Sequence, residues 1–143
     1  HPLCEVAANF SANITEQTLH ENDIGTFYRR VADAKFLVMV HGGGLDPCPK
    51  LFQSIIVGTI PIIESTALDD AYAHLPVAIV PSIAQFLSVD SINNTMALLA
   101  NWTDMYAPYY VMGSALRNET LHKLSQEYWW GVITARLRKL HYN

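Results

Sequence analysis

Positive charge is scarce in this sequence. Lysine and arginine together number 9, against 13 aspartates and glutamates, and charged residues make up 15% of the chain. Because binding to a phosphate backbone requires clustered lysine and arginine, this deficit argues against a nucleic-acid partner. The one basic cluster, residues 136–141, is expected to occupy the last turns of a helix, where cations suit the negative end of the helix dipole.

Cysteine is nearly absent. The two cysteines, Cys4 and Cys48, belong to neither a Cys-x-x-Cys nor a Cys/His ligand pattern, so we expect no structural zinc site. They can form one disulfide, and the sequence leaves open whether they do. No such link is required, because a domain of about 150 residues buries roughly two thirds of its unfolded surface.

Long apolar runs are missing as well. None approaches the length of about 18 residues that a membrane span requires, and the opening His1-Pro2-Leu3-Cys4 resembles neither an initiator methionine nor a signal peptide. Half of the residues are nevertheless apolar, which is too many for a disordered chain. We therefore expect residues 1–143 to form a single domain that is a fragment of a longer chain.

Asparagine, by contrast, follows a pattern. Five of the eight asparagines begin an Asn-x-Ser/Thr acceptor sequence for N-glycosylation. They are Asn9, Asn13, Asn93, Asn101 and Asn118. This enrichment is typical of a protein of the eukaryotic secretory lumen, and the alternative is that chance or turn chemistry placed them.

Apolar residues alternate between helical and strand patterns over the first eighty positions. Helical spacing covers residues 23–32, 49–57 and 68–74, and short apolar runs cover residues 36–40, 59–63 and 77–80. Pro49 suits the first turn of the second helix, and Gly58 suits its end. Three apolar runs without period-two alternation predict a parallel sheet covered by helices on both faces, so the fold class is α/β.

The same spacing assigns a buried face to several helices. The expected buried residues are Leu51, Phe52, Ile55 and Ile56 in the second helix, Ile92, Met96 and Leu99 in a helix after Asp90, and Leu121, Leu124, Tyr128 and Val132 in a longer helix over residues 118–140. Aromatic side chains bury large areas, so the triplet Tyr128-Trp129-Trp130 is expected to pack this last helix onto the sheet.

The segment His41-Gly-Gly-Gly-Leu-Asp-Pro-Cys-Pro-Lys50 lies between the end of a predicted strand and the start of a predicted helix. Open α/β sheets bind ligands at this edge. Glycines let backbone amides approach a ligand closely, and a helix amino terminus favours negative charge. The segment therefore predicts an anion site, the alternative being a tight turn without a ligand.

Three better-known sites do not fit this segment. Neither Gly-x-x-x-x-Gly-Lys-Ser/Thr nor Gly-x-Gly-x-x-Gly is present, which argues against a phosphate-binding loop and a dinucleotide fingerprint. A strand ending in His-Gly-Gly-Gly also contributes to the oxyanion hole of α/β-hydrolases. That activity requires a Gly-x-Ser-x-Gly nucleophile, and none follows in this chain, so the hydrolase alternative holds only if the sequence is truncated at both ends.

The stretch Lys35–Ile63, followed by Leu75–Val80, resembles the exostosin-like glycosyltransferases, family 47 of the glycosyltransferases. The specific part of the family pattern is an apolar strand, a glycine turn, a basic residue, an acidic residue three positions later, which is Gln53 in this sequence, and then Gly-x-Ile-Pro-Ile/Val. Such enzymes have two facing Rossmann-like domains, the GT-B arrangement, and the carboxyl-terminal domain holds most of the nucleotide-sugar donor. The resemblance implies that this chain is the donor-binding half and that an amino-terminal acceptor domain belongs to the whole protein.

The resemblance also implies roles for individual residues. The backbone amides of Gly42, Gly43 and Gly44 face the donor diphosphate, and Lys50 takes the position of the family's basic residue, which neutralises it. Gln53 occupies the position of a glutamate that accepts hydrogen bonds from the ribose, so this sequence departs from the family there.

Four further residues are candidate donor contacts because they follow predicted strands. They are His41, Glu64, Ser65 and Thr66. Asp69 and Asp70 are adjacent carboxylates, and we expect them to stabilise the positive end of a short helix rather than to bind a metal.

The resemblance implies that this chain is the donor-binding domain of a metal-independent glycosyltransferase. Such an enzyme moves a sugar from a nucleotide diphosphate to a glycan hydroxyl without a further cofactor, and we expect it to be a membrane-anchored protein of the Golgi or secretory lumen. Its general base is expected on the other domain, so no catalytic residue is assigned in this chain. Two alternatives remain: a non-catalytic nucleotide- or glycan-binding module, which Gln53 favours, and a structural interaction domain.

Overall fold

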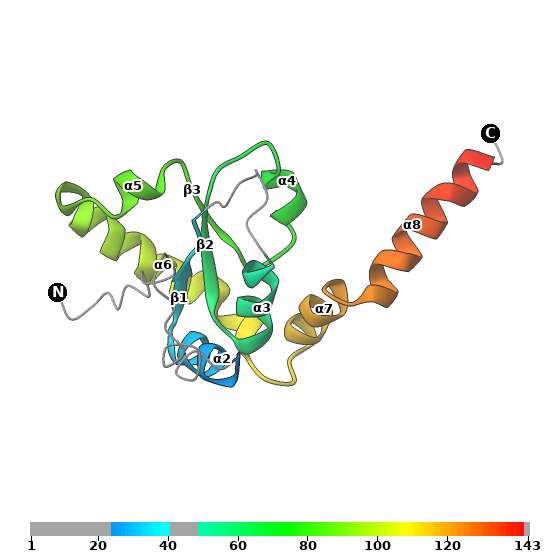
Figure 1. The fold of residues 1–143 in the computed structure, drawn as a ribbon, viewed down its shortest axis with the longest axis horizontal. Helices are drawn as coiled ribbons and strands as arrows, with labels where there is room; N and C mark the ends of the chain where they lie inside the picture. The colour runs from blue at the N-terminus through cyan, green and yellow to red at the C-terminus, as the bar shows by residue number, and fades with distance from the viewer. Residues whose placement is uncertain (1–23, 41–48, 142–143) are drawn as a thin grey trace, which may run out of the picture.

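Three short parallel strands lie at the centre of the molecule, with helices around them (Figure 1). The structure is a computed structural model that describes residues 24–40 and 49–141. The elements are α2 (Ile24–Asp33), β1 (Phe36–Val38), α3 (Lys50–Val57), β2 (Ile60–Glu64), α4 (Asp69–Tyr72), β3 (Ala78–Val80), α5 (Ile83–Phe86), the 3-10 turn η1 (Val89–Ser91), α6 (Ile92–Tyr110), α7 (Ala115–Lys123) and α8 (Gln126–His141).

The sheet has the order β1-β2-β3 within the described residues, and both strand pairs are parallel. Val38 is in register with Ile62, and Glu64 is in register with Val80. Because β2 is the central strand, its residues from Ile60 to Ile63 are buried on both faces, which explains why its sequence shows no alternation. The predicted parallel α/β sheet is confirmed.

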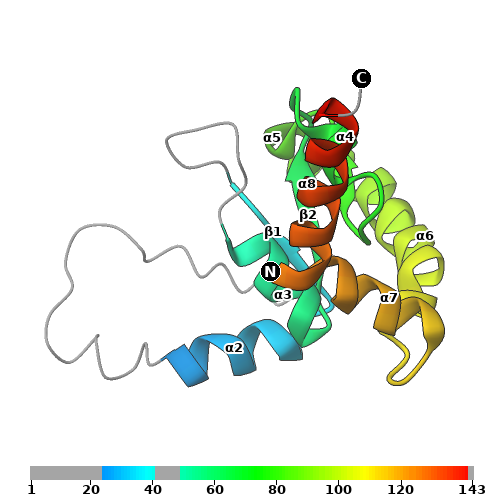
Figure 2. The same ribbon diagram turned by 90° about the vertical axis from the view of Figure 1, so that its right-hand side faces the viewer.

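Helices cover both faces of this sheet. On one face, α3 and α4 contribute Leu51, Ile55 and Tyr72 to a cluster that includes Ile63 of β2. On the other face, α5 and α6 contribute to a second cluster, which includes Ile60 and Ile62 of β2, Phe86 of α5 and Trp102 of α6. Figures 1 and 2 show α6 on the opposite side of the strands from α3.

Helix α3 begins and ends where its sequence predicts. Pro49 precedes it, and Gly58 ends it with a φ of 101°, a left-handed conformation that only glycine adopts without strain. The prediction that Phe52 and Ile56 are buried is wrong, since both side chains are exposed. The buried stripe includes Ser54 instead, whose hydroxyl donates to the carbonyl of Leu51 at 2.7 Å, because only one side of this helix meets the sheet.

The buried face of α6 also differs from the prediction. Ile92 and Met96 are exposed, whereas Thr95 and Trp102 are buried. Tyr106 lies one turn beyond Trp102 and donates its hydroxyl proton to the carbonyl of Val77 at 2.8 Å. The long aromatic side chains reach the sheet and so decide the rotation of the helix, which the spacing of its aliphatic residues does not predict.

The single helix predicted over residues 118–140 is divided into α7 and α8. Leu124 ends α7, and the hydroxyl oxygen of Ser125 accepts the backbone N–H of Tyr128 at 3.2 Å in the first turn of α8. A serine that caps the start of one helix in this way competes with continuation of the helix before it. The prediction of one uninterrupted helix is therefore wrong.

Trp130 does not pack α8 onto the sheet. Its side chain is 67% exposed, and that of Trp129 is 46% exposed. Figure 1 shows α8 running outward from α7, away from the strands. The expectation that the aromatic triplet packs against the sheet is therefore wrong.

Candidate functional site

The carboxyl ends of the three strands lie along one edge of the sheet, because the strands are parallel. Glu64 ends β2 at this edge, and Ser65 and Thr66 follow it. Lys50 is the first residue of α3, the helix after β1. The topology thus brings these predicted candidates to the same edge, and we call it the carboxyl edge.

Glu64 is held in position by the start of α5. Its Oε2 accepts the backbone N–H of Ile83 at 2.8 Å, so one carboxylate oxygen satisfies an amide at the amino end of that helix. The side chain is half-buried. This hydrogen bond orients the carboxylate at the carboxyl edge.

Ser65 and Thr66 interact with Asp69 at the start of α4. The Ser65 hydroxyl donates to Oδ2 of Asp69 at 2.6 Å, and the backbone N–H of Thr66 donates to Oδ1 at 2.8 Å. The hydrogen bond from Ser65, and to a smaller degree that from Thr66, lowers the pKa of the Asp69 carboxyl from its ordinary value of 3.8. Asp69 and Asp70 lie in the first turn of α4, which confirms their predicted place at a helix start.

Lys50 contacts an aromatic ring that the sequence did not single out. Its Nζ lies 5.8 Å from the centroid of the Phe27 ring, which belongs to α2. This distance is within the range of a cation–π interaction. No spacing in the sequence connects Phe27 to Lys50, because the two helices meet only through the fold.

Gln53 lies one turn after Lys50 on α3 and is half-buried. It is not part of the fully buried stripe, which consists of Leu51, Ser54 and Ile55. Since residues three apart share a side of a helix, Gln53 and Lys50 lie on the same side of α3. Two residues on the same side of a helix can contact one ligand, as the predicted site requires of Lys50 and Gln53.

The other predicted donor contacts lie outside the described residues. They are His41, Gly42, Gly43 and Gly44. Cys4 and Cys48 and the first two glycosylation sites, Asn9 and Asn13, also lie outside. All of these remain predictions.

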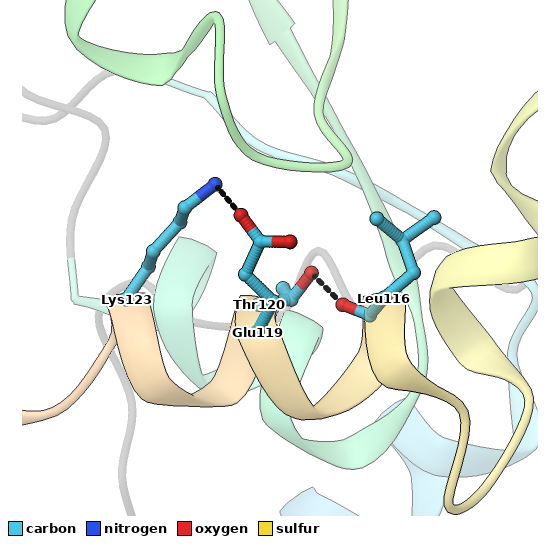
Figure 3. Close-up of polar contacts among 4 residues, drawn as sticks. All are labelled: Leu116, Glu119, Thr120 and Lys123. Atoms are coloured by element: carbon cyan, nitrogen blue, oxygen red, sulfur yellow. Dashed lines mark hydrogen bonds and ion pairs between the residues drawn. The ribbon is translucent and has the colours of Figure 1, made fainter.

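The remaining three sequon asparagines, Asn93, Asn101 and Asn118, are exposed on α6 and α7. The threonines of their sequons have structural contacts. Thr95 donates to the carbonyl of Phe86 at 2.7 Å, Thr103 donates to that of Leu99 at 2.8 Å, and Thr120 donates to that of Leu116 at 2.8 Å. Figure 3 shows the last of these contacts beside the ion pair of Lys123 with Glu119, 2.7 Å long.

A buried arginine fastens α7 to α3. Arg117 is 4% exposed, and its guanidinium donates from Nη1 to the carbonyl of Ile55 at 2.8 Å and from Nη2 to that of Ile56 at 2.7 Å. The cation lies 5.5 Å from the Tyr110 ring, and burial raises the pKa of the Tyr110 hydroxyl despite the nearby charge. These contacts hold the carboxyl end of α3, the helix that carries Lys50. Sequence reasoning missed Arg117, because its partners lie some sixty positions earlier.

An apolar hollow of about 510 Å³ lies beside the amino end of β3, not at the carboxyl edge. Its lining includes Tyr72, Trp102, Met105, Tyr106 and Tyr109. The hydroxyl of Tyr106 is already used by the carbonyl of Val77. We do not assign the hollow to the predicted anion site, because its lining has neither a cation nor a helix start.

Two features of the described residues concern metals and membranes. No three His, Cys, Asp or Glu side chains come together there as metal ligands. Among the helices between residues 24 and 141, none is both long and apolar enough to cross a membrane.

No protein-family model, curated protein or solved structure matches this chain. The resemblance to exostosin-like glycosyltransferases therefore depends on the motif residues alone.

Proposed function

We propose that this chain is the donor-binding domain of an exostosin-like glycosyltransferase with GT-B architecture. The observation that carries the proposal is the convergence of Lys50, at the start of α3, and the polar residues after β2 on the carboxyl edge of a parallel sheet. Ligands bind open α/β sheets at this edge.

The residues at the carboxyl edge have complementary roles in this proposal. Lys50 supplies a positive charge to the diphosphate, and the amides of Gly42, Gly43 and Gly44 supply neutral donors. Gln53, on the same side of α3 as Lys50, accepts a hydrogen bond from the ribose. The fixed carboxylate of Glu64 has a second oxygen that can accept from a sugar hydroxyl.

The reaction is transfer of a sugar from the nucleotide diphosphate to a glycan hydroxyl. Positioned donors stabilise the charge that develops on the leaving diphosphate, without a metal ion. The general base comes from the amino-terminal domain. The whole protein is a membrane-anchored glycoprotein of the Golgi or secretory lumen. Glycopeptide mass spectrometry of protein made in secreting eukaryotic cells tests this location, because it measures whether Asn93, Asn101 and Asn118 carry glycans.

The second candidate is a non-catalytic nucleotide- or glycan-binding module. Gln53 favours it, because an amide in place of the family's glutamate weakens the ribose contact. The transferase and a nucleotide-binding module both predict nucleotide binding at the carboxyl edge, and sugar transfer by the whole protein distinguishes them. A glycan-binding module predicts no nucleotide binding.

Calorimetric titration with uridine and guanosine diphosphates tests the proposal. Lys50→Ala is expected to weaken binding by about 1–3 kcal/mol through loss of a charge-assisted contact. Lys35→Ala is the matched control, because Lys35 is exposed and precedes β1 at the opposite edge of the sheet. Equal affinity of the wild type and Lys50→Ala would show that Lys50 is not part of the site. Absence of binding by any nucleoside diphosphate rejects the proposed function.

A further inference from the structure

Helix α8 has two different parts. Its beginning is anchored to the rest of the molecule, since the Tyr128 ring lies 5.6 Å from that of His122 on α7, and the Trp129 ring lies 6.4 Å from that of His74 after α4. Beyond these contacts, the helix runs outward from the body of the molecule (Figure 1).

The outward part carries apolar side chains that the described residues do not cover. Trp130 is 67% exposed, Ile133 is 48% exposed and Leu137 is 51% exposed. Their spacing of three and four positions places them on one face of the helix, and Trp129 adjoins that face. We call these four residues the α8 stripe. A contiguous exposed apolar face of this kind is typical of an interaction surface.

The charges beside the α8 stripe indicate its occupant. Glu127 and Arg138 are eleven positions apart, which is about three helical turns, so they lie along the same side of α8. Trp129 and Arg136 are seven positions apart, about two turns, and lie along the other side. Ile133 is near the midpoint of both pairs. The helix is therefore complementary to a second copy of itself that runs in the opposite direction.

We propose that two copies of this chain associate through antiparallel α8 helices, related by a two-fold axis near Ile133. Ile133 then meets Ile133 of the second copy, and Trp130 meets Leu137 of the second copy. Glu127 faces Arg138 of the second copy, and Trp129 faces the Arg136 guanidinium of the second copy, a favourable cation–π pair. A parallel arrangement would instead place like charges opposite each other. The proposal does not depend on nucleotide binding.

Sedimentation velocity of the 143-residue chain, from micromolar to several hundred micromolar, tests the proposal. We expect a concentration-dependent equilibrium between monomer and dimer. Ile133→Glu is expected to weaken the dimer at least tenfold with an unchanged melting temperature, because this side chain is outside both core clusters. Leu98→Glu, at an exposed apolar position of α6, is the matched control and is expected to leave the dimer intact. A chain that stays monomeric throughout, or an Ile133→Glu variant that dimerises like the control, overturns the proposal.

A charge exchange tests the antiparallel orientation. Glu127→Arg and Arg138→Glu are each expected to weaken the dimer about fivefold, and the double variant is expected to restore it. Both substitutions oppose the helix dipole, so a restored dimer cannot result from a more stable α8. A double variant that associates no better than the single variants overturns the antiparallel pairing.

Discussion

Gln53 is the residue at which this sequence and the family it resembles disagree. Because Gln53 is half-buried and outside the buried stripe of α3, a carboxylate at this position keeps access to solvent. We expect Gln53→Glu to raise nucleoside-diphosphate affinity by roughly 1 kcal/mol, about fivefold, with an unchanged melting temperature. Calorimetry of Gln53→Glu measures the affinity, and thermal melting of the same variant measures the melting temperature. A lower melting temperature without a gain in affinity contradicts the ribose contact.

Arg117 is the residue that connects α7 to α3. Arg117→Ala leaves two carbonyls without this donor and opens a space beneath Tyr110, so we expect the free energy of unfolding to fall by about 2–4 kcal/mol. Urea denaturation measures the loss. Arg30→Ala, at an exposed position of α2, is the control and is expected to change stability little. Equal effects of the two variants would show that the Arg117 hydrogen bonds do not stabilise the fold.

Asp69 makes stability depend on acid pH. Its folded-state pKa is below the ordinary value of 3.8, so the unfolded chain binds the proton more readily. The stabilisation is therefore complete above that ordinary value and is lost as the pH falls through the lowered pKa. Asp69→Asn should be less stable than the wild type at neutral pH, and the difference should shrink below about pH 4. Urea denaturation across this range measures it, with Asp70→Asn as the control. A difference that is independent of pH contradicts the assignment.

At the scale of single elements, two glycines predict opposite effects of the same substitution. Gly58 ends α3 with a φ of 101°, whereas Gly131 lies within α8. At neither position would an added Cβ come within 4 Å of an atom of the described residues beyond the adjacent residues and, for Gly131, the backbone of its own helix. Gly58→Ala should destabilise the protein by about 1–2 kcal/mol, because alanine is strained in the left-handed region. Gly131→Ala should stabilise α8 by about 0.5–1 kcal/mol. Urea denaturation and helical circular dichroism measure the two changes, and a destabilising Gly131→Ala would contradict the helical assignment at that position.

The exposure of the α8 stripe is also explained at the scale of single elements, by the break between α7 and α8. Ser125 caps α8 and changes the direction of the chain, and the stripe is exposed as a result. Had residues 118–140 formed one helix, Tyr128, eleven positions after Arg117, would have continued the face that α7 turns toward α3. Because of this cap, side chains of α8 that the sequence predicts to be packed are exposed instead, and they form a candidate interface.

At the scale of the whole molecule, the chain supplies one wall of a two-domain cleft in the proposed function. We expect the isolated chain to bind a nucleoside diphosphate and to transfer no sugar, because the proposed mechanism takes its general base from the other domain. Chelating agents should leave the affinity unchanged. A product assay with labelled nucleotide-sugar checks the first expectation, and transfer by this chain alone, free of contaminating enzyme, contradicts the two-domain arrangement.

Local chemistry made much of the fold predictable from the sequence. Pro49 and Gly58 mark the limits of α3 because their backbone requirements hold in any context. Short apolar runs without alternation indicate strands buried on both faces, and parallel strands bring their carboxyl ends to one edge. The common location of Lys50, Glu64, Ser65 and Thr66 follows from these facts alone.

Only the tertiary structure decided which side chains of each helix are buried and which partners they meet. The rotation of α6 depends on how far Trp102 and Tyr106 reach toward the sheet, and the role of Arg117 depends on carbonyls some sixty positions away. The contact between Phe27 and Lys50, and the exposure of Trp130, likewise arise from how separate helices meet. Sequence periodicity describes one helix at a time, whereas these features depend on the free energy of packing between elements that are distant in the chain.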